Sequence, residues 1–351
     1  MSPRLWLNGA LVDETAAGVS PMDHGLLTGD GVFETMRVYD RRIFAWDRHL
    51  DRLAHSAGAL GLGLPDRASL RSAADAVIAD NPSGDGRLRI TVTGGPAPLG
   101  SERGDTPPTV IVAMGALRAF PPTEAVVVVP WTRNEHGATA GLKTISYAEN
   151  VRALAYAHGH GASEAVFANT RGDLCEATGS NVFVVHDGVV HTPPPDAGCL
   201  LGVTRALVID CCEREGIPCA EVPVPMAALH AADEAFLTSS TREVQGIMSV
   251  DGVALPAAPG PVTERLRTAF TALVASGVEL SEPARRRACS GQPAVRRRCT
   301  TSPTETVSSA PSASCTTRAP VGPTSTASPS TTRPPPRSTR TRRPSVADRW
   351  R

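Results

Sequence analysis

Residues 141–154 read GLKTISYAENVRAL, and this stretch holds Lys143, the single lysine among the 35 basic residues of the chain. Arginine can replace lysine as a solvated surface cation. It cannot supply a neutral amine, because its guanidinium stays protonated over the working pH range. A chain with one lysine therefore directs attention to the chemistry of that amine. The alternative is chance survival at one surface position in an arginine-biased sequence.

The surroundings of Lys143 favour a chemical role. It follows the predicted strand AVVVVPW (residues 125–131) and precedes the predicted helix SYAENVRALAYAHGHGA (residues 146–162). A lysine that condenses with a carbonyl group needs a lowered pKa and a sheltered position that a ligand can still reach. A connecting segment that faces a cleft would supply both.

The composition is that of a globular chain with a polar extension. Of the 351 residues, 41% are hydrophobic, which is sufficient for a packed core, and no apolar run is long enough to cross a bilayer. The N-terminus, MSPRLWLNGALVDE, reaches polar and acidic residues too early for a signal peptide, so we expect a cytoplasmic protein. The eight cysteines form no CxxC pair, which predicts reduced thiols and no metal site.

The zero net charge conceals an uneven distribution. Residues 283–351 contain 14 Arg and two acids, so they carry a charge of +12 and the rest of the chain carries −12. Residues 281–351 are rich in Ser, Thr, Pro and Arg, and we predict a disordered tail there. The arginine clusters could contact nucleic acid or an anionic surface. We favour a tail without function, since no aromatic or helical pattern accompanies the charge.

The remaining sequence predicts an α+β or α/β body of two domains. We place a small N-terminal α+β domain at residues 1–115, a linker at 116–124 and a larger C-terminal domain at 125–280. Hairpin turns are predicted at Asn8-Gly9, Asp40-Arg41 and Asp187-Gly188. Helices are predicted where apolar residues recur at helical spacing, in segments 47–60, 69–78, 204–216 and 263–276.

Four further motifs could bind a charged ligand. Glu176, in LCEATGSNVFVV, is predicted at a turn ahead of a strand, where a buried carboxylate could hold a heterocyclic nitrogen in its protonated form. Gly202-Val203-Thr204 precedes a helix, whose free N–H groups suit an anion. Residues 238–241, TSST, end a strand with four hydroxyls, and Arg52 and Arg89 offer guanidinium groups for phosphate. Each motif alone also fits a structural explanation, such as a surface turn, an ordinary helix cap or a surface cation.

Together and in this order, the motifs resemble the class IV aminotransferases, the family with pyridoxal phosphate fold type IV. The segments that carry the resemblance are SPMDHGLLTGDGVFETMRVYD (20–40), HLDRL (49–53), GLK (141–143), EATGSNVF (176–183), GVTR (202–205) and TSST (238–241). It covers roughly residues 4–278. The family fold implies a C-terminal pseudo-barrel, the cofactor pyridoxal 5′-phosphate between the two domains, and a homodimer.

The resemblance also implies roles for individual residues. Lys143 would form the Schiff base with the cofactor and then transfer protons, and Glu176 would pair with the pyridine nitrogen. The residues implied for the phosphate are Arg52, Val203, Thr204, Ser240 and Thr241. Those implied for the substrate side are Arg37, Arg89 and Thr28.

The pocket motifs lean towards one reaction within this family. DHGLLTGDGVFETMRVYD is most similar to the 4-amino-4-deoxychorismate lyases, which release pyruvate and 4-aminobenzoate for folate synthesis. Branched-chain aminotransferases usually have an aromatic residue where Thr28 falls, and D-amino acid aminotransferases usually have further basic residues where this chain offers only Arg103. We therefore expect the lyase, with either aminotransferase as the alternative. A non-catalytic protein that binds nucleic acid through its tail is a remote third reading, because the set Lys143, Glu176 and Thr204 is intact.

Overall fold

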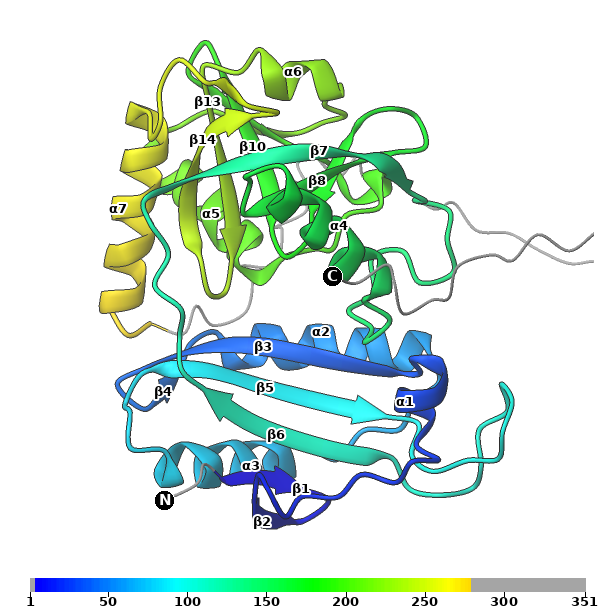
Figure 1. Ribbon diagram of the computed structural model, residues 1–351. Helices are drawn as coiled ribbons and strands as arrows, with labels where there is room; N and C mark the ends of the chain where they lie inside the picture. The colour runs from blue at the N-terminus through cyan, green and yellow to red at the C-terminus, as the bar shows by residue number, and fades with distance from the viewer. Residues whose placement is uncertain (1–3, 279–351) are drawn as a thin grey trace, which may run out of the picture. The chain divides into compact units, whose positions relative to one another are not determined.

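The computed structural model describes residues 4–278, which form two β-sheets with helices packed on their faces (Figure 1). The tail that we predicted at residues 281–351 lies outside the described residues. The mixed α+β architecture, with its curled half-barrel sheet, confirms the predicted fold class.

The first sheet has six strands in the order β2-β1-β6-β5-β3-β4, and neighbouring strands run antiparallel. Its strands are β1 (Arg4–Leu7), β2 (Ala10–Asp13), β3 (Gly31–Tyr39), β4 (Arg42–Ile43), β5 (Gly86–Thr93) and β6 (Thr109–Gly115). The predicted turns are confirmed: Asn8 and Gly9 join β1 to β2, and Asp40 and Arg41 join β3 to β4, all four with positive φ. The short helix α1 (His24–Thr28) leads into β3.

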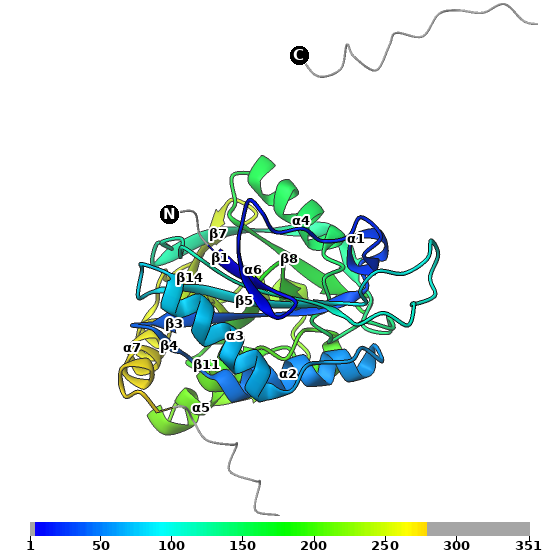
Figure 2. The same cartoon turned by 90° about the horizontal axis from the view of Figure 1, so that it is seen from below.

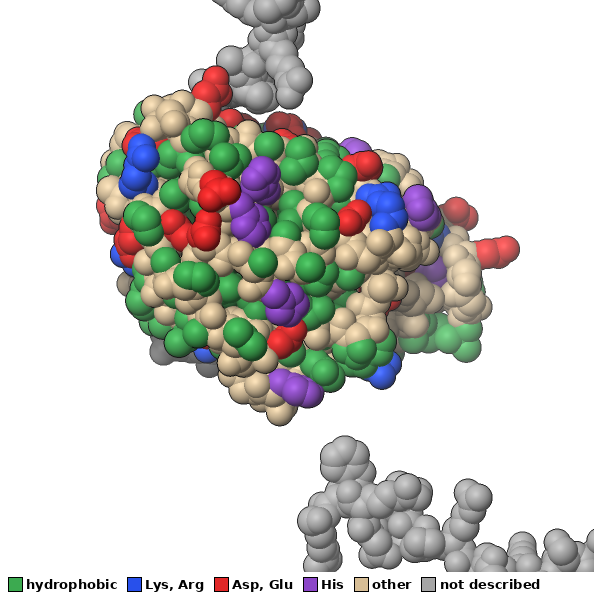
Figure 3. All heavy atoms as spheres, turned by 90° about the horizontal axis from the view of Figure 1, so that it is seen from above, with side chains coloured by type: hydrophobic (Ala, Val, Ile, Leu, Met, Phe, Trp, Pro, Cys, Tyr) green, Lys and Arg blue, Asp and Glu red, His purple; other side chains and the backbone are tan. Residues whose placement is uncertain are grey.

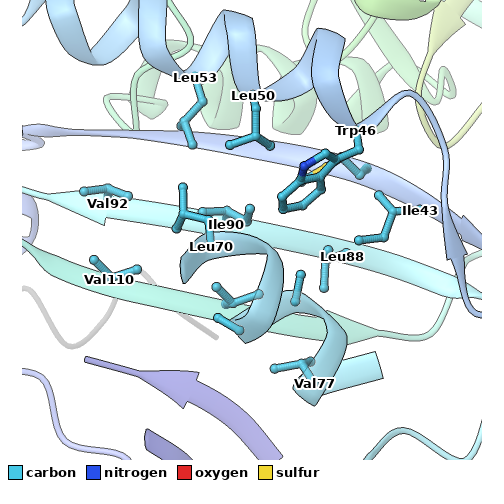
Figure 4. Close-up of a cluster of buried hydrophobic side chains, with 14 of the residues drawn as sticks. Ile43, Trp46, Leu50, Leu53, Leu70, Val77, Leu88, Ile90, Val92 and Val110 are labelled. Carbon is cyan, nitrogen blue, oxygen red and sulfur yellow. The ribbon is translucent and has the colours of Figure 1, made fainter. Parts of the chain in front are cut away.

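Two helices, α2 (Trp46–Ala59) and α3 (Arg67–Asp80), cover one face of this sheet (Figure 2). Their apolar side chains meet those of β3 and β5 in one buried cluster, shown in Figure 4 with Leu50, Leu53 and Leu70 directed at the strands. Successive side chains of a strand point to opposite faces. Val32 and Met36 of β3 belong to this cluster, so Phe33 and Arg37 project from the opposite face.

The second sheet has nine strands, in the order β12-β11-β10-β13-β14-β7-β8-β9 with β15 beside β14. They are β7 (Thr123–Arg133), β8 (Glu164–Asn169), β9 (Leu174–Ala177), β10 (Asn181–His186), β11 (Val189–Thr192), β12 (Cys219–Glu221), β13 (Glu234–Ser239), β14 (Glu243–Val250) and β15 (Val253–Ala254). The helices of this half are α4 (Ala148–Gly159), the 3₁₀ turn η1 (Pro195–Ala197), α5 (Val203–Glu215), α6 (Met226–His230) and α7 (Pro261–Ala275). The predicted turn at Asp187-Gly188 joins β10 to β11.

Buried aromatic and aliphatic side chains fix α5 and α7 against β10 and β13. Phe183 and Phe236 stack with ring centroids 4.8 Å apart, and Phe270 of α7 joins the same cluster. In the face shown in Figure 3, hydrophobic, polar and charged side chains are interspersed. Within residues 4–278 no helix combines the length and the apolar character that crossing a membrane requires.

Candidate active site

Lys143 lies in the connection between β7 and α4, where three hydrogen bonds hold the backbone of its segment. The N–H of Phe33 donates to the Lys143 carbonyl at 3.0 Å, and the N–H of Ile145 donates to the Gly31 carbonyl at 2.9 Å. The N–H of Lys143 itself donates to Oγ of Ser56, on α2, at 3.1 Å. The segment is therefore attached to β3 and α2, and the position of the lysine is set by both.

The side chain of Lys143 is directed at aromatic rings. Its Nζ lies 4.4 Å from the centroid of the Phe33 ring and 6.0 Å from that of Tyr147. Burial, with the positive charge of Arg52 second, lowers the pKa of Lys143 to about 8. A substantial fraction of the amine is then neutral near physiological pH, which is the state that attacks a carbonyl group.

Glu176 is close enough to Lys143 for each charge to affect the pKa of the other. Our prediction of a turn at this residue was wrong, because Glu176 lies within strand β9, paired with Phe167 of β8. Its Oε2 accepts a hydrogen bond from the N–H of Leu200 at 2.9 Å. Burial raises the pKa of Glu176 above its usual range, although Arg133 opposes this shift.

Arg133, which sequence reasoning missed, lies beside this carboxylate. Its Nε is 3.7 Å from Oε1 of Glu176 and has no hydrogen-bond partner among the described residues. Its other nitrogens bond to Glu149 at 3.3 Å and to Asn150 at 3.0 Å, and its guanidinium lies over the Phe167 ring at 4.4 Å. Arg133 at the end of β7 thus connects Glu176 to helix α4.

Arg52 bonds to strand β3 and to the loop that precedes α5. Its Nε and one terminal nitrogen donate to the two carboxylate oxygens of Glu34 at 2.7 and 2.8 Å, the bidentate geometry that is strongest for this pair. The remaining terminal nitrogen donates to the Leu201 carbonyl at 3.1 Å. One guanidinium therefore joins strand β3 to the loop that enters α5.

Backbone N–H groups at the start of α5 lack a side-chain cap. The N-cap residue is Gly202, and Val203 and Thr204 form the first helical turn. A Cβ atom on Gly202 would lie 2.0 Å from Oδ1 of Asn181, whose amide nitrogen donates to the Leu200 carbonyl at 2.7 Å. Glycine is required here by this close approach. The uncapped N–H groups form an anion site of the kind found at helix N-termini.

The turn between β13 and β14 brings Ser240 and Thr241 towards α2. Nε2 of His49 lies 3.5 Å from Oγ of Ser240, while Nδ1 of His49 lies 2.7 Å from the Glu34 carboxylate. Arg52 and His49 are three residues apart on one face of α2. They therefore approach both loops that the sequence marked for phosphate, the α5 entrance through Leu201 and the TSST turn through Ser240.

Comparison with known proteins identifies the family to which this arrangement belongs. The family model for Amino-transferase class IV matches residues 31–250. The D-alanine aminotransferase of Listeria innocua is 32% identical over 76% of this chain and 94% of its own length. The chain belongs to the class IV aminotransferase family.

Solved structures of this family match the fold as well. The branched-chain aminotransferase of Thermoproteus uzoniensis superposes with a TM-score of 0.74, at 30% identity over 79% of this chain and 96% of that one. A Legionella pneumophila structure named for 4-amino-4-deoxychorismate lyase has a TM-score of 0.70, and covers 74% of this chain and 96% of its own. Its 24% identity shows a shared fold alone.

Class IV aminotransferases use pyridoxal phosphate, and the side chains of this site fit that cofactor. A partly neutral lysine amine suits its aldehyde, and a sheltered carboxylate suits its ring nitrogen. The uncapped N-terminus of α5 and the hydroxyls of the TSST turn suit its phosphate. Arg52 and His49 link the α5 entrance to the TSST turn, and the N–H of Leu200 connects Glu176 to the same α5 entrance.

The residues predicted for the substrate side of this class IV site lie in different surroundings. Arg89 stacks on the Phe33 ring at 3.7 Å, next to Lys143, and donates to Thr91 at 3.0 Å. The guanidinium of Arg37 already has two partners, because it pairs with Glu243 at 3.2 Å and donates to the Thr241 carbonyl at 3.4 Å.

Two other residues considered for substrate recognition have local partners. Thr28 is exposed at the end of α1 and donates to the His24 carbonyl at 2.7 Å. The guanidinium of Arg103 bonds to both Asp30 oxygens, at 2.5 and 2.6 Å, and to the Gly61 carbonyl at 2.8 Å. The guanidinium of Arg103, the basic residue considered after the RLRITV strand, is therefore already bound by two loops of the N-terminal half.

A signal in the sequence could have identified Glu34 and His49, which we did not predict. Glu34 occupies a position of β3 that alternation assigns to the helix-covered face, between Val32 and Met36. His49 lies on the apolar face of α2, next to Leu50. A charged residue on a core-facing position requires a partner. The sequence pattern therefore indicated that Glu34 and His49 are buried and have polar partners.

Proposed function

We propose that this protein is a pyridoxal-phosphate-dependent aminotransferase that exchanges the amino group of an α-amino acid for the oxo group of a 2-oxo acid. The observation that carries the proposal is the setting of Lys143, whose pKa burial lowers to about 8 between the Phe33 ring and the charges of Arg52 and Glu176. The 30–32% identity to aminotransferases supports transfer over elimination.

Pyridoxal phosphate, when bound, supplies a conjugated ring that withdraws electrons from the carbon bearing the amino group. Lys143 Nζ acts as the base that takes a proton from that carbon and delivers it to the cofactor carbon joined to the amino nitrogen. Glu176, held by the Leu200 N–H, stabilises the protonated ring nitrogen. Burial keeps both groups out of bulk water, which strengthens their mutual effect.

The phosphate is bound, in this proposal, by N–H groups of Val203 and Thr204, by the hydroxyls of Ser240 and Thr241, and by the free N–H groups of Arg52. Arg52 has five N–H donors, and three of them are engaged by Glu34 and the Leu201 carbonyl. Two donors remain for a phosphate oxygen. Most of the hydrogen bonds to the phosphate therefore come from the two loops.

Substrate recognition is assigned to Arg89. Its guanidinium is next to Lys143 on the uncovered face of the first sheet, and the described residues include no acid that pairs with it. It therefore suits a substrate carboxylate. Since Arg103 is bound by Asp30, the structure supports a branched-chain donor more than a D-amino acid donor.

The activity is tested by incubating the purified full-length chain and pyridoxal phosphate with L-leucine or D-alanine, each with 2-oxoglutarate. Glutamate formation is the readout. We expect glutamate from L-leucine and none from the Lys143→Ala chain. Absence of glutamate with every donor, in a chain that shows the cofactor's visible band, would reject the aminotransferase.

The second candidate is the 4-amino-4-deoxychorismate lyase. The motif at residues 20–40 favours it, and so does the position of Arg89, because a dicarboxylate needs a cation beside the reacting centre. The same enzyme preparation is incubated with 4-amino-4-deoxychorismate. Release of 4-aminobenzoate without any glutamate in the first assay would establish the lyase instead.

We also propose a homodimer. Several large hydrophobic side chains are exposed in the described chain, among them Leu26 at 70%, Leu99 at 78%, Val151 at 66% and Leu201 at 49%. Such exposed apolar side chains are commonly covered in assemblies. Analytical ultracentrifugation of the full chain at micromolar concentration should give twice the monomer mass, and a monomer would contradict the proposal.

A further inference from the structure

The pair Glu34 and His49 is buried beside the proposed phosphate site and has no role in the chemistry described above. Glu34 is 0% exposed and His49 is 1% exposed. Buried ionisable side chains are costly unless they are paired. Their position between Arg52 and Ser240 indicates what they do.

Glu34 removes most of the positive charge that Arg52 would otherwise offer to a phosphate. The two form a bidentate ion pair. Burial alone would raise the pKa of Glu34, but Arg52 and His49 together outweigh burial and hold that pKa well below its usual range. The local charge of the pair is therefore close to zero. A phosphate monoester carries between one and two negative charges near pH 7. The helix N-terminus of α5 supplies only about half a charge in compensation.

The hydrogen bonds of His49 define its tautomer. An ionised carboxylate only accepts, so Nδ1 of His49 must donate to Glu34 at 2.7 Å. Burial lowers the pKa of His49, which leaves Nε2 without a proton near neutral pH. In that form Nε2 can only accept, and the donor that faces it is Oγ of Ser240 at 3.5 Å.

Ser240 has a single hydroxyl hydrogen, which can go to His49 or to a phosphate oxygen but not to both. If the phosphate takes it, Nε2 of a neutral His49 is left buried without a donor, which is unfavourable. A second proton on His49 removes the conflict. Nε2 then donates to Oγ of Ser240, and the Ser240 hydrogen is free to donate to the phosphate.

We propose that His49 takes up a proton when the cofactor phosphate binds, so that Glu34 and His49 act as positioning residues that orient Ser240 and add a positive charge to the site. The inference rests on the proposed phosphate site. The proton comes from solvent and is held at Nε2, between the Glu34 carboxylate and the phosphate. No bond between heavy atoms forms or breaks.

Charged side chains among the described residues act on the protonation of His49 in both directions. Glu34 from β3 favours the protonated form, whereas Arg52 from the same helix and Lys143 from the segment before α4 oppose it. Ser240 from the β13–β14 turn is neutral. The phosphate adds at least one negative charge to this balance, and its sign favours protonation.

The test measures protons taken up on binding, with pyridoxamine 5′-phosphate as the probe. This compound carries the phosphate but no aldehyde, so it does not condense with Lys143. Isothermal titration calorimetry of the apoprotein in buffers of different ionisation enthalpy gives the proton count at each pH. The matched variants are His49→Gln, which keeps a polar amide there but does not titrate, and His55→Gln, an exposed histidine of the same helix.

We expect the wild-type and His55→Gln chains to take up about one proton more than His49→Gln at the maximum, in a pH window that begins above the lowered pKa of His49 in the apoprotein. The dissociation constant of the wild-type chain should then rise up to about tenfold per pH unit across this window, and that of His49→Gln should rise less. Equal proton counts in wild type and His49→Gln would overturn the proposal.

The same titrations distinguish this inference from the proposed phosphate site. Pyridoxine, which lacks the phosphate, should produce no extra proton uptake. If Arg52→Ala binds pyridoxamine 5′-phosphate as tightly as wild type does, Arg52 has no part in phosphate binding. If Gly202→Ala, which displaces the N–H groups at the start of α5, also binds as tightly as wild type, the phosphate site itself is wrong and the inference falls with it. If Arg52→Ala binds weakly but His49→Gln shows the wild-type proton count, only the role of His49 is rejected.

Discussion

Nζ of Lys143 lies 4.4 Å from the centroid of the Phe33 ring, and the backbone N–H of Phe33 donates to the Lys143 carbonyl at 3.0 Å. One residue of β3 thus fixes both the backbone and the side chain of the candidate catalytic lysine. The ring face stabilises the ammonium form, while burial and Arg52 oppose it. Burial prevails, and the pKa falls to about 8.

This pKa predicts the pH dependence of cofactor capture. A lysine with a pKa of about 8 has roughly one-tenth of its amine neutral at pH 7 and about nine-tenths at pH 9. The rate at which the apoprotein takes up pyridoxal phosphate should rise about fivefold from pH 7 to 8, about tenfold from pH 7 to 9, and level off above about pH 9. Stopped-flow absorbance at the wavelength of the bound cofactor measures it.

The control for this experiment is the Lys143→Arg chain, which keeps a cation at the position but has no neutral amine. It should show no absorbance change of this kind at any pH. A wild-type rate that continues to rise to pH 10 or above would contradict the lowered pKa of Lys143.

Substitutions of Arg52 and Glu34 can separate the contribution of Arg52 to stability from its contribution to cofactor binding. Arg52→Ala leaves the buried Glu34 carboxylate without its main partner, which should cost about 3–5 kcal/mol of unfolding free energy. The double variant Arg52→Leu/Glu34→Leu removes both charges and should regain most of that stability. It should still bind pyridoxal phosphate weakly, because the phosphate loses Arg52.

Urea unfolding and cofactor titration of the single and double variants check this separation. Should the double variant bind the cofactor as wild type does, Arg52 has no part in phosphate binding. Should Arg52→Ala unfold at the wild-type urea concentration, the pair contributes nothing to stability.

The sequence indicated which segments carry the candidate site, but not which contacts connect them. Hairpin turns such as Asn8-Gly9 were readable because turn chemistry is local. Lys143, Glu176 and Thr204 were proposed as site residues because their motifs occur in an order that resembles a family. The contact between Arg52 and Glu34 was not predicted, because it joins residues 18 positions apart whose register depends on packing of α2 on β3.

Glu176 shows the same limit at the level of secondary structure. Its neighbours Ala177, Thr178 and Gly179 are small or polar, which is typical of a turn, yet residues 174–177 form β9. Pairing with Phe167 on β8 overrode the local preference. Arg133 was missed because only the folded sheet, in which β7 and β9 flank β8, brings its side chain to Glu176.

Glu176→Gln tests the role of this carboxylate. Glutamine keeps an oxygen that can accept the hydrogen bond from the Leu200 N–H, so the fold and cofactor binding should change little. The negative charge is lost, and turnover should fall by about 100-fold or more. Steady-state kinetics beside the visible spectrum provide the two readouts, and the exposed Glu149→Gln is the control.

A Glu176→Gln chain with wild-type turnover and a normal spectrum would exclude Glu176 as the partner of the ring nitrogen. A chain without any cofactor band would instead show that the carboxylate is needed for binding.

Gly202 provides a test of the anion site at the start of α5 that leaves every charge in place. In Gly202→Ala the new Cβ would lie 2.0 Å from Oδ1 of Asn181, so Asn181 or the loop must move. Overpacking of this kind costs about 1–3 kcal/mol and would displace the N–H groups of Val203 and Thr204. We expect cofactor affinity to fall about tenfold or more.

The matched control is Gly179→Ala, because a Cβ on Gly179 would meet nothing within 4 Å. This chain should keep wild-type affinity. In the double variant Gly202→Ala/Asn181→Ala the collision is removed, and a double-mutant cycle should show that the Gly202 substitution costs less in the Asn181→Ala background. Equal costs in both backgrounds would mean that contact with Asn181 is not what requires glycine at residue 202.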